Sequence, residues 1–151
     1  MLDKYLLVLQ RLSYLFYWFF DNLNILMRLK FIRGNIKSQE TTIRLAYKFW
    51  LAACLLGIIC AIRTLVVLAT EEYNVEKNKD AGDAQAKKKR INQQRVVCWI
   101  NIARKLGDSL ICSQGLNYPS QLLGFQFNDA FVGFGGLASA LLSCYLLYPS
   151  K

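Results

Sequence analysis

The residues that most often carry out chemistry in proteins are sparse in this chain of 151 residues. It contains no histidine, which is the commonest general base and the commonest metal ligand. Three aspartates, Asp21, Asp108 and Asp129, lie near or within apolar regions, each in a different segment. Without a histidine or a glycine-rich phosphate loop they form no recognisable catalytic set, so the sequence predicts a protein that is not an enzyme.

The five cysteines do not indicate a metal site or a disulfide framework. None belongs to a CxxC pair, and most lie in apolar stretches. This pattern is typical of buried free thiols in a reducing compartment. We therefore expect no metal and no cofactor, and leave a bound lipid open as the one ligand. The cysteines are Cys54, Cys60, Cys98, Cys112 and Cys144.

The composition favours a membrane protein. Hydrophobic residues make up 54% of the chain, its mean hydropathy is +0.23, and its formal charge is +9. The hydrophobic share exceeds that of an average soluble domain. Most basic residues border apolar segments, where they can contact an anionic membrane surface. No basic and aromatic module of a nucleic-acid-binding domain is visible, so the expected partners are membrane lipids and not nucleic acid.

The hydrophobic pattern predicts an all-α membrane protein with about four helices in one domain, residues 1–151. The expected helices cover residues 5–33, 42–73, 92–113 and 125–148, with a polar loop over residues 71–95. Gly34 is expected to end the first helix and Thr42 to cap the second. The first helix is expected to be embedded in its first half and interfacial in its second.

Two of these segments are long enough to cross a membrane. The run from Phe49 to Ala69 has 21 residues, interrupted by Arg63, and is about 31 Å long as a helix. The uncharged run from Ala130 to Tyr148 has 19 residues and is about 28 Å long. Both lengths match a hydrocarbon core of roughly 30 Å. We expect two or three embedded helices in all.

Several residues are expected at the membrane interface. Trp50 and Tyr73 flank the second segment as aromatic anchors, and the long side chain of Arg63 can reach the interface. A basic cluster follows the polar stretch, where it is either a solvated helix end or a contact with anionic lipid headgroups. The cluster consists of Lys87, Lys88, Lys89 and Arg90.

The third segment is amphipathic. Its apolar positions include Trp99 and Leu106, whereas Arg104, Lys105 and Asp108 fall on another face. This separation predicts a surface or interfacial helix that does not cross the membrane.

Small residues are concentrated in the last segment. Pairs of small residues four positions apart let helix backbones approach closely in lipid. The contact is either with another helix of this chain or with a second chain, which includes a homo-oligomer. The residues are Gly133, Gly135, Gly136, Ser139 and Ala140.

Four stretches, in this order, resemble the peroxisomal biogenesis factor 11 (peroxin-11) family. The stretch YLFYWFFDNLNIL, which contains Asp21 and Asn22, is similar to the family's aromatic-rich segment. The stretch IRLAYKFWLAACLLGIICAIRTL is similar to the basic segment that follows it. NIARKLGDSLICSQGLNY resembles an amphipathic helix with a central aspartate, here Asp108. VGFGGLASALLSCYLLY resembles the closing span, with Ala140 in place of the second serine of the family pattern.

This resemblance implies a non-enzymatic protein of the peroxisomal membrane that acts in membrane organisation, proliferation and fission. The chain begins at what resembles the middle of the family pattern, so the family's N-terminal amphipathic region is expected to be missing. The alternative hypothesis is a structural accessory subunit of a large organellar complex, derived from this family. Its expected location is the mitochondrial inner membrane, and its partners would be the other subunits.

Overall fold

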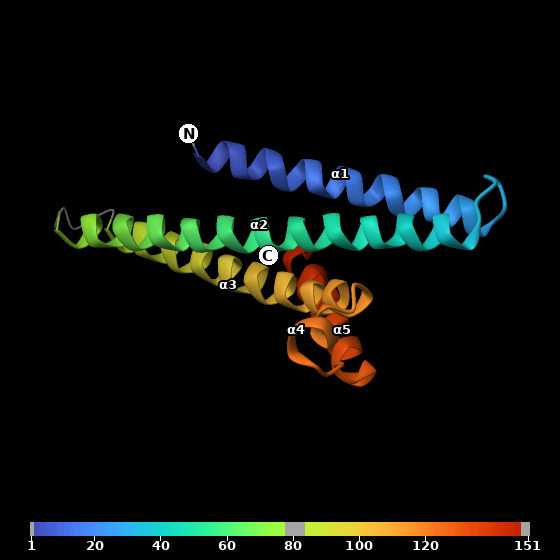
Figure 1. The fold of residues 1–151 in the computed structure, drawn as a ribbon. Helices are drawn as coiled ribbons and strands as arrows, with labels where there is room; N and C mark the ends of the chain where they lie inside the picture. The colour runs from blue at the N-terminus through green and yellow to red at the C-terminus, as the bar shows by residue number, and fades with distance from the viewer. Residues whose placement is uncertain (1, 78–83, 149–151) are drawn as a thin grey trace.

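The computed structural model describes residues 2–77 and 84–148, which fold into five helices. No strand occurs in these two ranges, which confirms the all-α prediction. In Figure 1, α1 lies along one side of α2 and α3 along another, while α5 packs against α3. The helices are α1 (Leu2–Arg28), α2 (Ile36–Lys77), α3 (Ala84–Gly115), α4 (Tyr118–Leu123) and α5 (Asp129–Leu147).

Aromatic stacking joins α1 to α2 in an antiparallel hairpin. The rings of Phe16 and Phe20 stack on Phe49, with centroid distances of 5.1 and 5.7 Å. The ring of Tyr17 stacks on Trp50 at 5.1 Å. These pairs bring the middle of α1 to the start of the apolar run on α2, so the first half of α1 lies beside that run.

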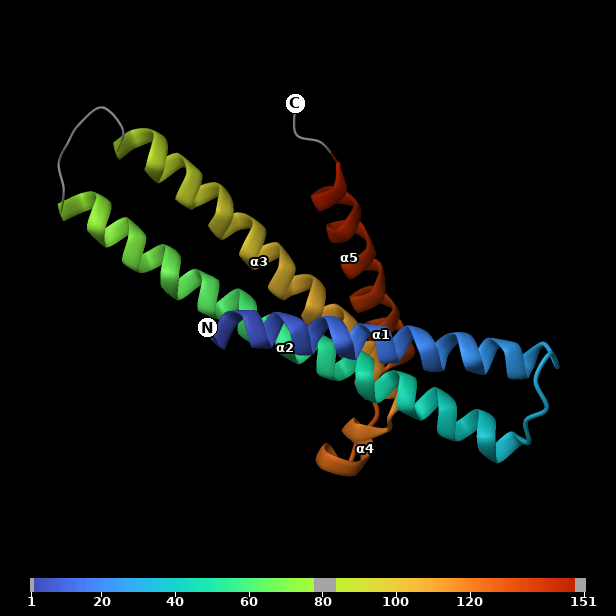
Figure 2. The same ribbon diagram turned by 90° about the horizontal axis from the view of Figure 1, so that it is seen from above.

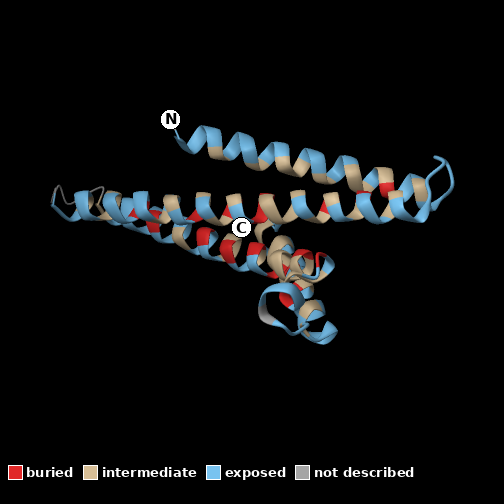
Figure 3. Ribbon diagram, viewed as in Figure 1, coloured by how far each residue is buried: buried red, intermediate tan, exposed pale blue. Residues whose placement is uncertain are grey.

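Small residues line the contact between α2 and α3. Ala53, Cys54, Gly57 and Ala61 are buried on α2, and their short side chains allow the helices to approach closely. Figure 3 shows that the buried residues, in red, follow this contact, whereas most of α1 is exposed or half-buried. The core is therefore a narrow strip between helices.

Several predicted helix ends were wrong. α1 ends at Arg28 and not near Gly34, because Lys30 adopts the left-handed conformation with φ of 61°. α2 begins at Ile36 and not near Thr42. The side chain of Asn35 accepts a hydrogen bond from the Ser38 backbone amide at 2.7 Å, as an N-cap does.

The polar loop expected over residues 71–95 was also wrong for most of its length. Residues 71–77 complete α2 and residues 84–95 begin α3, while the part from 78 to 83 lies outside the described residues. Both helical parts are rich in Glu, Lys, Gln and Ala, which favour helix. Three glutamate–cation pairs also join them across the hairpin, a long-range gain that composition alone does not reveal.

The C-terminal third contains a helix that the sequence pattern did not predict. α4 has six residues, begins after Asn117 and carries a proline in its first turn, where proline is tolerated. The side chain of Asn128 then caps α5 by accepting a hydrogen bond from the Ala130 amide at 3.0 Å. In Figure 2, α5 diverges from α3 toward its C-terminal end, so these two helices form a V. α2 and α5 are the two helices in the described ranges that are long and apolar enough to cross a membrane.

Candidate functional site

An apolar belt surrounds the bundle. Between Tyr5 and Phe20 on α1, Arg11 is the one exposed charged residue, and apolar or aromatic side chains fill the other exposed positions. The exposed residues of the apolar run 49–69 on α2 and of residues 130–147 on α5 are likewise uncharged. We define the apolar belt as the exposed apolar side chains of residues 7–19 on α1, 55–67 on α2, 96–106 on α3 and 131–145 on α5.

α3 contributes to this belt although its sequence is amphipathic. Every exposed residue from Val96 to Ser113 is apolar, and Trp99 is 61% exposed. The charged side chains of this part are turned toward the other helices: Lys105 is only 8% exposed, and Arg104 and Asp108 are half-buried. A surface helix in water would present these charges to solvent, whereas α3 turns its apolar face outward and its charged side chains toward the other helices.

The inward polar side chains form what we call the polar seam. They come from three helices that are far apart in the sequence, and most of them are hydrogen-bonded to one another. The polar seam consists of Gln10 and Tyr14 on α1, Arg104, Lys105 and Asp108 on α3, and Ser139 and Ser143 on α5.

One half of the polar seam lies where α1, α2 and α3 meet. The ammonium of Lys105 donates a hydrogen bond to the Tyr14 hydroxyl. Gly57 of α2 makes room for this contact, because a Cβ there would lie 2.7 Å from Gln10 Nε2 and 3.3 Å from Lys105 Cε. A side chain at position 57 would therefore displace the end of the Gln10 side chain, which lies in this space.

The other half of the polar seam lies where α3 crosses α5. A Cβ on Gly107 would lie 2.4 Å from the backbone oxygen of Gly135, so the two backbones are in direct contact. The Ser139 hydroxyl donates a hydrogen bond to Asp108 Oδ1 at 2.5 Å. Arg104 continues the contact by donating to the Ser143 hydroxyl at 3.4 Å. Close backbones and interhelical hydrogen bonds are the features that hold helices together in lipid.

The five small residues predicted as a helix contact divide into two groups. Gly135 and Ser139 are buried against α3, and a Cβ on Gly136 would lie 2.9 Å from Ile111 Cδ1. Gly133 has open space around it, and Ala140 is exposed. The contact within the chain therefore involves three of the five residues, and a contact with a second chain stays a prediction.

The predicted interface residues lie in different environments. Trp50 is half-buried because its ring stacks on Tyr17, whereas Tyr73 is exposed near the end of α2. Arg63 forms an ion pair with Asp3 at 2.5 Å, so α1 supplies a counter-charge within the apolar run of α2.

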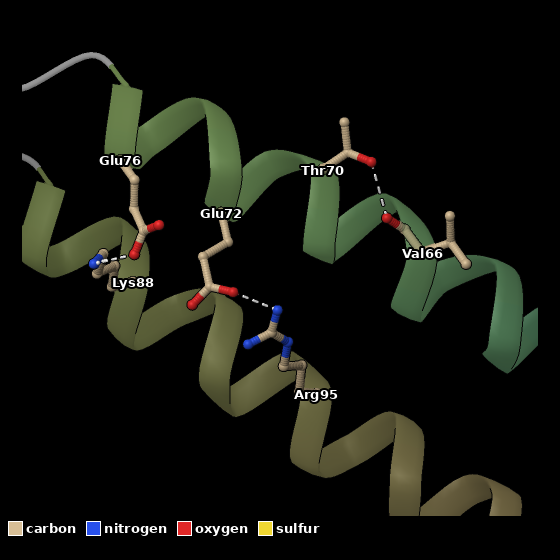
Figure 4. A network of polar contacts seen from close by, with 6 residues as sticks. All are labelled: Val66, Thr70, Glu72, Glu76, Lys88 and Arg95. Atoms are coloured by element: carbon tan, nitrogen blue, oxygen red, sulfur yellow. Dashed lines mark hydrogen bonds and ion pairs between the residues drawn. The ribbon is translucent and has the colours of Figure 1, made fainter.

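The basic cluster lies near the start of α3, and all four of its residues are exposed. Figure 4 shows two of the ion pairs at this end of the bundle, Lys88 with Glu76 at 2.8 Å and Arg95 with Glu72 at 2.5 Å. The hydrogen bond that Lys88 donates to the Glu76 carboxylate raises the pKa of Lys88, so this lysine is charged at neutral pH. Lys87 and Lys89 form no ion pair with the residues that the structure describes.

The polar residues of the family pattern are also separated in space. Asp108 belongs to the polar seam, Asp21 is half-buried on α1, and Asn22 is exposed and donates to the Trp18 carbonyl at 2.7 Å. Sequence reasoning did not single out Tyr14, Gly57 or Gly107, whose importance depends on partners in other helices. The glycine immediately before Asp108 was the one available sign of a close contact.

These features define an all-α protein with an apolar belt, an internal polar seam and two helices capable of spanning a membrane. The sequence model of the family described as Peroxisomal biogenesis factor 11 (PEX11) matches residues 2–148. The chain therefore belongs to the PEX11 family. Neither a curated protein nor a solved structure matches it.

Proposed function

We propose that this chain is an integral protein of the peroxisomal membrane that organises that membrane during peroxisome proliferation. The observation that carries this proposal is the orientation of α3, whose apolar side chains face outward and whose charged side chains face the other helices. Its apolar side chains form part of the apolar belt, while Lys105 and Asp108 contact other helices. Inside a membrane, charged side chains face the bundle interior and pair there, whereas lipid covers the apolar surface.

Membership of a family of peroxisomal biogenesis factors supports the choice of organelle. Nothing in the fold or in the family match supports the mitochondrial alternative. We propose a role without catalysis, because hydrogen bonds between helices pair six of the seven side chains of the polar seam. In this proposal the direct partners are membrane lipids, which contact the apolar belt, and the charged residues at both ends of the bundle lie at the interfaces.

The test is the location of a tagged chain in cells. We expect the protein to co-localise with a peroxisomal membrane marker, to stay in the membrane pellet after alkaline extraction, and to change peroxisome number or length when overproduced. Release by alkaline extraction would contradict the membrane role. A signal confined to mitochondria would contradict the peroxisomal assignment while leaving the membrane role intact.

A further inference from the structure

A groove of about 1090 Å³ lies between α3 and α5. Its walls come from residues 89–100 of α3 on one side. On the other side they are Cys144, Tyr145 and Leu146 of α5 and Tyr148, which directly follows α5, toward the open end of the V in Figure 2. The volume slightly exceeds the range for small-molecule sites, which are typically about 300–1,000 Å³ and mostly apolar.

The polarity of the groove changes along α3. Lys89, Asn92 and Gln93 line it near the start of the helix, and Val96, Val97 and Ile100 line it further along. On the α5 side the groove is bounded mainly by apolar and aromatic side chains. An occupant must therefore be amphiphilic, with its polar part near Lys89.

The ion pairs between α2 and α3 show where the polar and apolar parts of the groove lie along α2, relative to its apolar run. Arg95 lies beside Glu72, three residues beyond the end of the apolar run at Ala69. Val97 and Ile100 therefore lie beside that run. Lys88 lies beside Glu76, seven residues beyond Ala69, so Lys89 is about two helical turns beyond the run. If α2 spans the membrane, the groove extends from headgroup level into the hydrocarbon.

We propose that this groove binds one phospholipid with an anionic headgroup, an inference that rests on the proposed membrane function. Lys89 would contact the negative group that distinguishes an anionic headgroup from the zwitterionic headgroup of phosphatidylcholine, which in phosphatidylserine is the serine carboxylate. The acyl chains would lie between α3 and α5. The neighbouring cations Lys88 and Arg90 are engaged by Glu76 and Glu71, whereas Lys89 has no ion-pair partner among the residues that the structure describes. Its charge is thus available to an anionic group at the groove.

The proposal is tested with purified protein in nanodiscs that contain equal amounts of phosphatidylserine and phosphatidylcholine. Native mass spectrometry after release into mild detergent counts the lipids that remain bound. We expect one retained phospholipid, with phosphatidylserine favoured about fivefold, the effect of one lysine near an anionic group.

Three variants separate the groove from the general surface charge. Lys89→Gln should abolish the headgroup preference, and Val97→Trp, which fills the groove from an exposed position, should abolish retention. Lys87→Gln is the matched control because Lys87 is an exposed lysine that does not line the groove, and it should behave as wild type. Lys89→Gln changes one exposed side chain, so its result does not depend on how the protein tolerates a tryptophan.

Equal retention of the two lipids by wild-type protein would overturn the proposal, as would lipid retention by Val97→Trp that equals wild type. A dimer that Val97→Trp dissociates, with no retained lipid in wild type, would assign the groove to a second copy of the chain instead. Failure of wild-type protein to enter nanodiscs would contradict the proposed membrane function itself. Reconstituted protein without retained lipid would contradict the groove alone.

Discussion

Lys105 carries a charge at a position that is only 8% exposed, between α1, α2 and α3. Its ammonium donates a hydrogen bond to the Tyr14 hydroxyl, and its stem lies close to Gly57. A buried cation is costly unless polar groups surround it. Tyr14 supplies such a polar group from α1, so this contact helps to fix how α1 lies against α3.

At the crossing of α3 and α5, we predict that Gly107→Ala destabilises the protein by about 1–3 kcal/mol. The reason is that the new Cβ would lie 2.4 Å from a backbone oxygen, which cannot move without shifting α5. Gly133→Ala is the control, because nothing lies within 4 Å of a Cβ there. That change should be neutral or stabilise α5 by up to about 1 kcal/mol.

Unfolding of each variant in detergent, followed by circular dichroism, measures both effects. Equal stabilities for Gly107→Ala and Gly133→Ala would show that the backbones of α3 and α5 are not in contact.

The hydrogen bond between Ser139 and Asp108 gives a second prediction at the residue scale. In a double-mutant cycle of Ser139→Ala and Asp108→Ala, we expect a coupling free energy of about 0.6 kcal/mol and at most about 1.7 kcal/mol. This is the measured range for hydrogen bonds between helices in a membrane protein. Strictly additive effects on the free energy of unfolding would mean that the two side chains do not interact.

Prediction from sequence succeeded for individual residues where the signal is local. The pair Gly135 and Ser139 is visible as small residues four positions apart on one helix. Tyr14 and Lys105 are 91 positions apart, so no periodicity within one segment relates them. The sequence places Gly57 in an apolar run. It does not show that side chains from α1 and α3, Gln10 and Lys105, occupy the space beside this glycine.

At the scale of elements, the apolar runs predicted correctly where the helices lie. The helix ends predicted from polar residues differ from those in the structure. The core of α2 and nearly all of α5 follow the sequence prediction. The charged stretch before and after residues 78–83 was expected to be a loop, but it extends two helices. Ion pairs such as Glu72 with Arg95 require the antiparallel arrangement of α2 and α3. Composition alone does not predict that arrangement.

The apolar run of α2 supports a prediction with a matched pair of substitutions. Ile59→Lys introduces a charge on the exposed face of the candidate span, whereas Ile36→Lys does so at the start of the helix, outside the run. In lipid, a lysine near the centre of a helix costs about 3 kcal/mol. In water, an exposed substitution usually changes stability by less than about 0.5 kcal/mol.

We therefore expect Ile59→Lys to reduce membrane insertion at least tenfold and Ile36→Lys to leave it unchanged. Alkaline extraction and quantification of the pellet measure the fraction inserted. Similar insertion for both variants would indicate that α2 does not cross the membrane at Ile59.

At the scale of the whole molecule, composition indicated a membrane protein, but the relative orientation of the helices had to come from the structure. The amphipathic pattern of α3 separates its polar and apolar faces without showing which of them meets the other helices. Packing decides this, because Lys105 and Asp108 find polar partners on α1 and α5. Because these charged side chains face inward, the apolar face of α3 that includes Trp99 faces outward and forms part of the apolar belt.

The most direct test of the account asks what surrounds the indole of Trp99. A variant that keeps Trp99 and carries Trp18→Phe and Trp50→Phe is placed in bilayers with brominated acyl chains. In the control, all three tryptophans are replaced by phenylalanine and Phe31→Trp reports on the turn between α1 and α2, where the side chain is 80% exposed.

We predict that brominated acyl chains quench the fluorescence of Trp99 and that aqueous iodide does not, whereas iodide quenches the tryptophan at position 31. This result would place the apolar face of α3 in the hydrocarbon. Quenching of Trp99 by iodide to the same extent as at position 31, with no effect of the brominated lipid, would contradict the embedded belt.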